Sequence, residues 1–446
     1  MTGHVLISEV TRQQSAVSYI QLRQLRQLRS MPSKSSHGVL YQYRNCRLLR
    51  NHSIYKDDLW VRDGKIVNPE ILFFEEKSYA DIQIDCNGAI ICAGFIETQI
   101  NGAFGVDFSQ VPDKGTIEEG VLKVAKGLLA HGVTSFCPTV ITSPPSTYHK
   151  ILPHIKKSPG TKEGAGVLGA HVEGPFISPE KKGAHPPEHI RTFDNGFQDV
   201  IETFGSVSDV AIVTLAPELK NSKMVIEEFI KRGIVVSLGH SQSNLVQGEE
   251  AVNQGACYIT HLFNAMLPFH HRDPHLVGLL ASERLPKDRT IYYGLISDGI
   301  HTHPAALRIA HRVHPQGLVL VTDAIQAMGL PEGFYVFGEQ EIEIKGKRAV
   351  LAGTDTLCGS ISTLDNCVRH FIKSTNCGQV LALEAASLHP AKMMGITAQK
   401  GTLEFNTDAD FIVINDNLEP LATYIAGELV WENPASPSLV ISKVKD

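Results

Sequence analysis

The stretch Val167-Leu168-Gly169-Ala170-His171-Val172-Glu173 is a short apolar run that ends in a carboxylate, directly before Gly174 and Pro175. An apolar run of this length, bounded by glycine and proline, is typical of a strand buried in a parallel sheet. Glu173 is then expected at the carboxyl end of that strand. In sheets of parallel strands, this end carries the side chains that bind ligands and do chemistry.

Runs of the same kind recur from about residue 94 to 323 and alternate with amphipathic stretches. Eight such strands in alternation with helices predict an α/β fold, a (β/α)8 TIM-type barrel. An open doubly wound sheet is the alternative, but no Gly-rich dinucleotide fingerprint follows an early strand. The predicted strands are Gly94–Gln99, Val133–Pro138, Val167–Glu173, Val210–Ala216, Ile234–His240, Cys257–His261, Tyr292–Ser297 and Leu318–Asp323. The predicted helices include Glu118–Leu129, Met224–Arg232, Leu245–Asn253, Ser362–Ser374 and Leu381–Met394.

Segments on both sides of this barrel have the alternating pattern of half-exposed strands. Within residues 37–93, the run Leu59–Arg62 leads into an Asp-Gly turn, which predicts a hairpin. Residues 395–446 return to the same pattern. We therefore predict a small discontinuous β-domain built from residues 37–93 and 395–446, and a metal-dependent barrel at 94–394. The strands expected in its second part are Gly401–Glu404 and Asp410–Ile414.

The first 36 residues differ from the rest of the chain. They carry a three-residue repeat, Gln21–Arg29, and a single acidic residue, Glu9. A disordered extension at 1–36, or an upstream start preceding Met31, is the preferred interpretation of this composition. An Arg-rich, acid-poor mitochondrial transit peptide is the alternative.

The bulk composition is that of a soluble globular protein, with 43% hydrophobic and 20% charged residues. The net charge of −6 gives no general attraction to nucleic acid or to acidic membranes, so an anionic small-molecule substrate would need a local basic pocket. No apolar run is long enough to span a bilayer and no signal-peptide core lies near the start, so a cytoplasmic location is expected. The eight cysteines contain no C-x-x-C pair and are expected as reduced thiols.

Four side chains suited to metal binding or proton transfer lie at the ends of predicted strands. Glu173 ends the third strand, His240 the fifth, His261 the sixth and Asp323 the eighth. Taken singly, each has an ordinary explanation: a solvated Glu, a hydrogen-bonded structural His or an Asp helix N-cap. A barrel brings strand ends together, and four such coincidences favour a functional cluster.

This set of side chains has the composition of a mononuclear metal hydrolase. A divalent ion held by Glu173, His240 and His261 keeps an open position for water and lowers the pKa of that water toward about 7. The metal-bound hydroxide would attack an amide carbonyl. Asp323 would take a proton as general base and return it to the leaving amine as general acid. Zinc suits two imidazoles and a carboxylate, as do cobalt, iron and manganese.

Seven short segments around these residues match one family of barrel enzymes. They are Ala93–Gly102, His171–Phe176, Gly183–Pro186, Gly239–Ser241, His261–Met266, Ser297–His301 and Thr322–Ala324. Through them the chain resembles the N-acetylglucosamine-6-phosphate deacetylases of the amidohydrolase superfamily, from about residue 40 to about 430. Each segment is weak alone, but together they are specific. The resemblance implies that Glu173, His240 and His261 are the metal ligands and that Asp323 is the acid and base.

The first barrel strand departs from the pattern of most amidohydrolases. Those enzymes carry His-x-His there, which supplies ligands for a second metal position, whereas this chain has Gln99-Ile100-Asn101. The departure is similar to the deacetylase branch of the superfamily. It implies one divalent metal ion per subunit, with zinc as the expected ion.

The resemblance also implies a set of substrate contacts. Arg272 matches an Arg that binds the substrate phosphate and that related enzymes contribute across a homodimer interface; on spacing alone, it could instead form a surface ion pair with Asp273. His185 matches a donor to the acetamide oxygen, and His301 matches a substrate-contacting His. The other matched positions are Ala184 beside the sugar, Asn264 and Ala265 facing the phosphate, and Leu357, Cys358, Gly359 and Ser360 in a loop that closes over the substrate.

The predicted function is hydrolysis of the N-acetyl group of N-acetylglucosamine 6-phosphate to glucosamine 6-phosphate and acetate, in amino-sugar catabolism, by a homodimer. The choice between the 6-phosphates of N-acetylglucosamine and N-acetylgalactosamine stays open. Another amidohydrolase, such as a cyclic amidase or an aminoacylase, is the first alternative. A binuclear cyclic amidase normally has a bridging Lys on the fourth strand, and Thr214–Glu218 contains none. A non-catalytic barrel scaffold is the second alternative, but such a protein would not need to keep Asp323.

Overall fold

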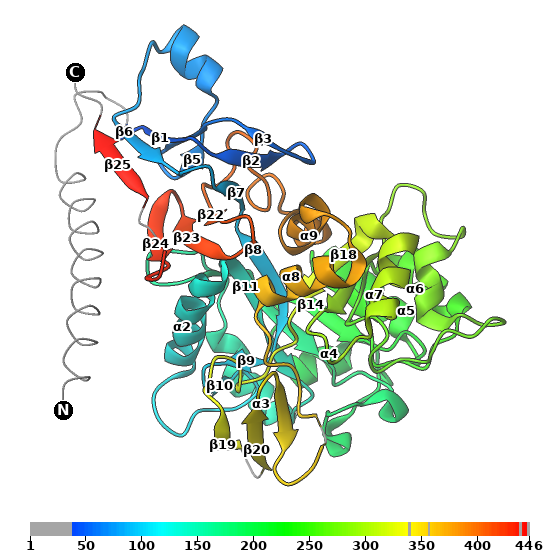
Figure 1. The fold of residues 1–446 in the computed structure, drawn as a ribbon. Coiled ribbons are helices and arrows are strands. Elements are labelled where there is room, and N and C mark those ends of the chain that lie inside the picture. The colour runs from blue at the N-terminus through cyan, green and yellow to red at the C-terminus, as the bar shows by residue number, and fades with distance from the viewer. Residues whose placement is uncertain (1–37, 338–339, 356, 437–438, 444–446) are drawn as a thin grey trace, which may run out of the picture. The chain divides into compact units, whose positions relative to one another are not determined.

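The computed structural model describes residues 38–337, 340–355, 357–436 and 439–443. The chain divides into two compact units (Figure 1). One unit is Gly94–Gly401, and the other combines the described residues up to Ala93 with those from Thr402 onward. The extension predicted at 1–36 lies outside the described residues. Within the part of the chain that the structure describes, no helix is long and apolar enough to cross a membrane.

The unit Gly94–Gly401 is built around eight parallel strands that form a nearly closed barrel, which confirms the predicted fold class (Figure 1). Neighbours in sequence are neighbours in the sheet, from β8 to β18. These two end strands meet through the bridge between Ile100 and Ala324. The strands are β8 (Phe95–Ile100), β11 (Val133–Ile141), β13 (Ala170–Glu173), β14 (Val210–Leu215), β15 (Val235–Leu238), β16 (Tyr258–Ile259), β17 (Tyr292–Ile296) and β18 (Leu318–Val321).

The barrel strands are apolar on both faces because one face lines the barrel interior and the other packs under helices. Every residue of β14 and of β18 is buried. This double burial explains the continuous apolar runs of the sequence, since a half-exposed strand would alternate instead. Between the strands lie α2 (Ile117–Leu128), α3 (Pro145–Ile151), α4 (Phe197–Phe204), α5 (Ser222–Lys231), α6 (Leu245–Gln254) and α7 (Pro304–Val313).

Local sequence signals set the bounds of α2. The Thr116 hydroxyl accepts a hydrogen bond from the Glu119 backbone N–H, and the Glu119 carboxylate accepts one from the Thr116 backbone N–H. This capping box satisfies two backbone donors that a helix start leaves free. The buried side chains are Val121, Val124, Ala125 and Leu128, whose spacing of three or four residues forms one apolar face.

Both ends of the chain build the second unit, in two sheets. One sheet has the order β25 (Val440–Lys443), β6 (Ile82–Asp85), β1 (Tyr41–Arg44), β4 (Leu59–Arg62) and β5 (Lys65–Ile66). The other has the order β24 (Glu428–Glu432), β23 (Pro420–Ile425), β22 (Phe411–Ile414), β7 (Ile90–Ala93), β2 (Arg47–Arg50) and β3 (Ser53–Lys56). The predicted hairpin is the antiparallel pair β4 and β5.

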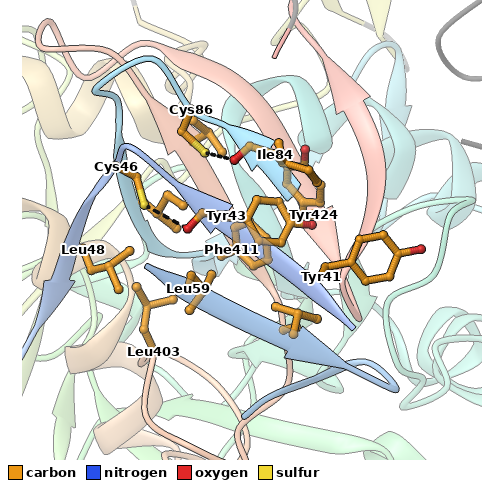
Figure 2. Close-up of a cluster of buried hydrophobic side chains, with 14 of the residues drawn as sticks. Tyr41, Tyr43, Cys46, Leu48, Leu59, Ile84, Cys86, Leu403, Phe411 and Tyr424 are labelled. Carbon is orange, nitrogen blue, oxygen red and sulfur yellow. Dashed lines mark hydrogen bonds between the residues drawn. The ribbon is translucent and has the colours of Figure 1, made fainter. Parts of the chain in front are cut away.

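A cluster of buried hydrophobic side chains, which includes the rings of Tyr43, Phe411 and Tyr424, forms a core of this second unit (Figure 2). The Tyr43 ring lies edge-on to Phe411, with ring centroids 5.0 Å apart, and edge-on to Tyr424 at 5.3 Å. The Cys46 thiol donates to the Tyr43 carbonyl, and the Cys86 thiol donates to the Ile84 carbonyl. The hydrogen bond with the neighbouring thiol of Cys46, followed by burial, raises the pKa of Cys86, so this thiol stays neutral and packs as an apolar group.

Three sequence-based expectations about the later part of the chain differ from the structure. Residues 395–401, predicted in the small domain, belong to the barrel unit because backbone bonds from Ile396 and Lys400 continue the turn after α10 (Leu388–Met393). Gly401–Glu404 is not a strand. The helix predicted at Leu381–Met394 is two helices, because Ser387 has a non-helical backbone between α9 (Gln379–Ala386) and α10.

One element of the barrel unit was not predicted at all. After β18 the chain forms a separate antiparallel sheet of three strands, β19 (Gly333–Phe337), β20 (Gln340–Lys345) and β21 (Arg348–Leu351). The predicted helix at Ser362–Ser374 follows it as α8 (Leu364–Thr375). The insertion therefore separates the last barrel strand from its helix.

Candidate active site

The four residues predicted for metal binding and proton transfer lie at the carboxyl ends of barrel strands. Glu173 is the last residue of β13, while His240, His261 and Asp323 lie two residues beyond β15, β16 and β18. These three have φ angles of 49°, 29° and 47°, in the left-handed region that side chains other than glycine rarely adopt. Such strain persists only where surrounding contacts determine the backbone, and it is concentrated at functional sites.

Three ligand-type atoms converge at the centre of this end of the barrel. Glu173 Oε1 lies 3.0 Å from His240 Nε2 and 2.9 Å from His261 Nε2. The two Nε2 atoms are 3.0 Å apart, and all three side chains are buried. Residues separated by up to 88 positions in sequence thus form one compact triad.

The hydrogen-bond partners of the triad indicate where its protons and charges lie. His240 Nδ1 lies 2.8 Å from the Lys181 carbonyl, which can only accept, so the proton of a neutral His240 is on Nδ1 and its Nε2 presents a lone pair. Burial disfavours a charge on His261, but the hydrogen bond and charge of Glu173 raise the pKa of His261 to about 9. Burial likewise opposes the charge on Glu173, yet both imidazoles hold the pKa of Glu173 well below its ordinary value.

A divalent cation at the centre of the triad would replace the proton that Glu173 holds on His261, because a metal ion and a proton compete for the same Nε2 lone pair. One carboxylate and two imidazoles are a donor set that divalent transition metals take. His261 Nδ1 finds no partner among the described residues, so nothing there opposes coordination through Nε2. The residues present fit a divalent metal ion.

His185 belongs to the same cluster but differs in proton placement. Ligand atoms of Glu173, His185 and His240 lie within 4.8 Å of one another, a grouping that would allow His185 as a third ligand in place of His261. The Thr142 backbone N–H, at 3.4 Å, and its hydroxyl, at 2.7 Å, both contact His185 Nδ1. Because Nδ1 accepts, the proton of His185 lies on Nε2, which favours a donor role and leaves coordination to His261. Burial and the nearby charge of His240 lower the pKa of His185 to about 3, so it stays neutral.

Two amides hold Asp323. Asn101 Nδ2 donates to Asp323 Oδ1 at 2.8 Å, and Gln99 Nε2 approaches the same oxygen at 3.3 Å. Gln99 Nε2 also lies 3.1 Å from both carboxylate oxygens of Glu173. The positions that carry His-x-His in most amidohydrolases therefore hold two amides that orient carboxylates. Burial, and then the charge of Glu173, raise the pKa of Asp323 above its ordinary value.

His301 has an acidic partner that sequence reasoning missed. Its Nδ1 lies 2.6 Å from Asp298 Oδ2, and the other oxygen of this carboxylate accepts the backbone N–H groups of Ile300 and His301. Burial opposes a charge on His301, but Asp298 outweighs it and raises the pKa of His301. The spacing of three residues in Ser297–His301 could have suggested this pair. Nothing in the sequence marks Thr142 as the partner of His185.

The segment His261–Ala265 is folded tightly against the triad. The Asn264 backbone N–H donates to the His261 carbonyl at 2.9 Å, and the Ser241 N–H donates to the Ala265 carbonyl at 3.2 Å. Phe263 and Ala265 both have positive φ angles, 78° and 49°. These contacts keep Asn264 and Ala265 next to His261.

Arg272 is exposed, unlike the buried residues of the triad. Its guanidinium contacts the His271 ring, and within the described residues no carboxylate pairs with it. Asp273 Oδ1 instead accepts the backbone N–H groups of Leu245 and His275. The surface ion pair of Arg272 with Asp273 is therefore not formed, which leaves the guanidinium charge available to a ligand.

The remaining predicted contacts are divided between the site and the surface. Ser360 forms a bridge with Ala324, and its carbonyl accepts the Ile325 N–H at 2.9 Å, so it lies beside the strand end that carries Asp323. Leu357, at the other end of the loop, pairs with Val350 and is 37% exposed. Cys358 and Gly359 connect the two, and Ala184 is exposed directly before the buried His185.

This barrel, with buried carboxylate and imidazole ligands at its carboxyl end, defines a class of metal-dependent hydrolases. The sequence matches the amidohydrolase family over residues 90–430. The chain belongs to the amidohydrolase family.

Relatives with assigned activities narrow this class. The chain is 60% identical over 404 residues to the N-acetylglucosamine-6-phosphate deacetylase of Danio rerio, covering 90% of this chain and 100% of that protein. It is 58% identical over 396 residues to that of Homo sapiens, covering 89% and 96%. Within the family, the chain groups with the N-acetylglucosamine-6-phosphate deacetylases, which confirms the resemblance seen in the sequence.

A solved structure agrees with this grouping. The deacetylase of Mycobacterium smegmatis, solved in complex with N-acetyl-D-glucosamine-6-phosphate, superimposes with a TM-score of 0.73. It is 27% identical in sequence and covers 89% of this chain and 100% of that one. The alternative of a different amidohydrolase activity is not favoured by these comparisons.

Proposed function

We propose that this chain hydrolyses the N-acetyl group of N-acetylglucosamine 6-phosphate, giving glucosamine 6-phosphate and acetate in amino-sugar catabolism. The observation that carries this proposal is the buried triad of Glu173, His240 and His261 with Asp323 beside it. The assigned activity of relatives that are about 60% identical supports the choice of substrate.

The triad holds one divalent ion per subunit, most suitably zinc. When bound, such an ion activates water and polarises the carbonyl of the acetamide. The count of one is supported by Gln99 and Asn101, whose amides occupy the positions of the usual second pair of ligands and are engaged with Glu173 and Asp323.

Asp323 moves the proton. Its Oδ1 is held by the amides of Asn101 and Gln99, so Oδ2 is the oxygen that accepts a proton from water and returns it to the leaving amine. A raised pKa suits both steps, because the carboxyl must lose and regain the proton near neutral pH. His185, neutral and protonated on Nε2, donates a hydrogen bond to the acetamide oxygen as negative charge develops there.

The phosphate and sugar are bound by groups around this centre. Arg272, exposed and without a carboxylate partner among the described residues, binds the phosphate of a substrate held by the other subunit of a homodimer. Asn264 and Ala265 present backbone groups to the phosphate, and His301, oriented by Asp298, contacts the sugar. Ala184 lies beside the sugar, and the loop of Leu357, Cys358, Gly359 and Ser360 closes over it.

The domain division and location complete the proposal. Residues 94–394 form the catalytic domain, and residues 37–93 with 395–446 form a separate β-domain, apart from the boundary shift at 395–401 described above. The enzyme works in the cytoplasm. This location is supported by the eight free cysteines, since thiols persist in reducing compartments.

A metal-analysed deacetylation assay tests this function. Purified protein is assayed for acetate release from the 6-phosphates of N-acetylglucosamine and N-acetylgalactosamine and from unphosphorylated N-acetylglucosamine. We expect the highest kcat/KM with N-acetylglucosamine 6-phosphate and one metal ion per chain. Equal activity on the unphosphorylated sugar would contradict the phosphate site, and faster hydrolysis of a cyclic amide or an N-acetylamino acid would replace the proposed substrate.

A further inference from the structure

A side-chain carboxylate takes part in the hydrogen bonding between the first and last strands of the barrel. Glu97 lies on β8, is 0% exposed and points its carboxylate at this seam. Its Oε1 accepts the Gln99 backbone N–H at 3.1 Å, and its Oε2 accepts the Thr322 backbone N–H at 3.1 Å. A side-chain carboxylate thus takes the place that a strand carbonyl would have in a regular ladder.

We propose that Glu97 is a positioning residue for Asp323: its carboxylate fixes the backbone from Thr322 onward, so that Asp323 meets its two amide partners and faces the substrate. This inference rests on the proposed function, in which Asp323 transfers the proton. Glu97 itself does not touch the triad and is not a ligand.

The backbone at Asp323 needs such support. Its φ angle of 47° is a strained conformation that surrounding contacts must impose. Three consecutive backbone N–H groups are held: that of Thr322 by Glu97, that of Asp323 by the Gln99 carbonyl at 2.9 Å, and that of Ala324 by the Thr322 hydroxyl at 3.3 Å. The first two acceptors both belong to β8, so Glu97 and Gln99 together tie the two strands where the acid-base residue begins.

The chemistry of a carboxylate suits this place. Both oxygens accept backbone N–H groups, whereas a glutamine amide would present its own N–H to one of those donors. Burial raises the pKa of Glu97, while the backbone N–H groups of Gln99 and Thr322 favour its charged carboxylate, so an ionisable group stands here in spite of a desolvation cost. An apolar residue would avoid that cost but would leave both N–H groups unsatisfied.

A double-mutant cycle tests the proposal. Glu97→Gln, Asp323→Asn and the double variant are assayed with N-acetylglucosamine 6-phosphate, together with their metal content and Tm. Glu97→Gln is expected to lower kcat by about 10- to 100-fold, as a misplaced catalytic group does, with KM and metal content near those of the parent. In the Asp323→Asn background the same change should lower kcat by less than about twofold, because a residue that acts through Asp323 has nothing left to position.

A matched control separates positioning from general stability. Glu249 is also a buried carboxylate of the barrel unit, but it accepts from the Ser282 hydroxyl away from the site. Glu249→Gln should leave kcat unchanged. If Glu97→Gln does not fold, Glu97→Asp, which keeps both acceptors on a shorter side chain, takes its place in the cycle.

Each outcome has a definite meaning. Additive losses in the double variant, a loss of metal, or a lowered Tm with normal kcat would each overturn the positioning role of Glu97 while the proposed function stands. A parent protein that releases no acetate would overturn the proposed function and this inference together.

Discussion

Asp323→Asn is the substitution that most directly tests the proton-transfer role. The introduced amide has nearly the same shape as the carboxylate but cannot take up a proton. The structure determines how it would sit. Asn101 and Gln99 both donate to Oδ1, so the amide oxygen must occupy that position, since an amide nitrogen there would face two N–H donors.

The size of the expected effect follows from this geometry. The amide nitrogen then lies where Oδ2 was, and the one atom placed to accept a proton becomes a donor. General acid–base catalysis contributes about 10²- to 10⁴-fold, so kcat should fall by that factor, or by about 3–5 kcal/mol of transition-state stabilisation. Because both amide contacts are kept, KM and metal content should change by less than about threefold.

Steady-state assays of acetate release, with metal analysis of the same samples, measure this change. Asp365→Asn is a suitable control, because Asp365 is another buried carboxylate of the barrel unit and binds His131 and Arg369 away from the triad. It should lower Tm and leave kcat near normal. A kcat for Asp323→Asn within about tenfold of the parent would remove Asp323 from proton transfer.

Three further predictions concern binding, metal and pH. Arg272→Ala should raise KM for the sugar phosphate by about 10- to 100-fold, the effect of losing a charge-assisted hydrogen bond, and should not alter KM for the unphosphorylated sugar; equal changes for both would contradict a phosphate contact. Removal of metal with a chelator should abolish activity and lower Tm, because Glu173, His240 and His261 then lose their central cation. One zinc ion per chain should restore both activity and Tm. A need for two ions would contradict the single site. Burial opposes the charge on Asp365, but His131 and Arg369 lower its pKa to about 2. Its ion pairs therefore contribute about 2 kcal/mol to the free energy of unfolding above pH ~4, and this contribution is lost as pH falls toward 2. Denaturation at a series of pH values should show this loss in the parent and a flatter profile in Asp365→Asn.

The barrel could be predicted because strands that are buried on both faces appear in the sequence as continuous apolar runs. Strands such as β14 and β18 are apolar throughout, and their predicted bounds differ from the observed ones by a residue or two. The three strands β19 to β21 were missed because they form a partly exposed insertion, without the continuous apolar run that was taken as the strand signal. The break at Ser387 was missed because the buried residues around it suit one long helix as well as two.

The sequence by itself determined which residue types stand at the strand ends, and so identified Glu173, His240, His261 and Asp323 as a possible metal and proton-transfer set. Only the tertiary structure decided how each is held. Gln99 and Asp323 are 224 positions apart, and Thr142 and His185 are 43 apart, so no local pattern links them. Their contacts exist because closing the barrel brings distant strands side by side. The proton on His185, the orientation of Asp323 and the seam at Glu97 all follow from that closure.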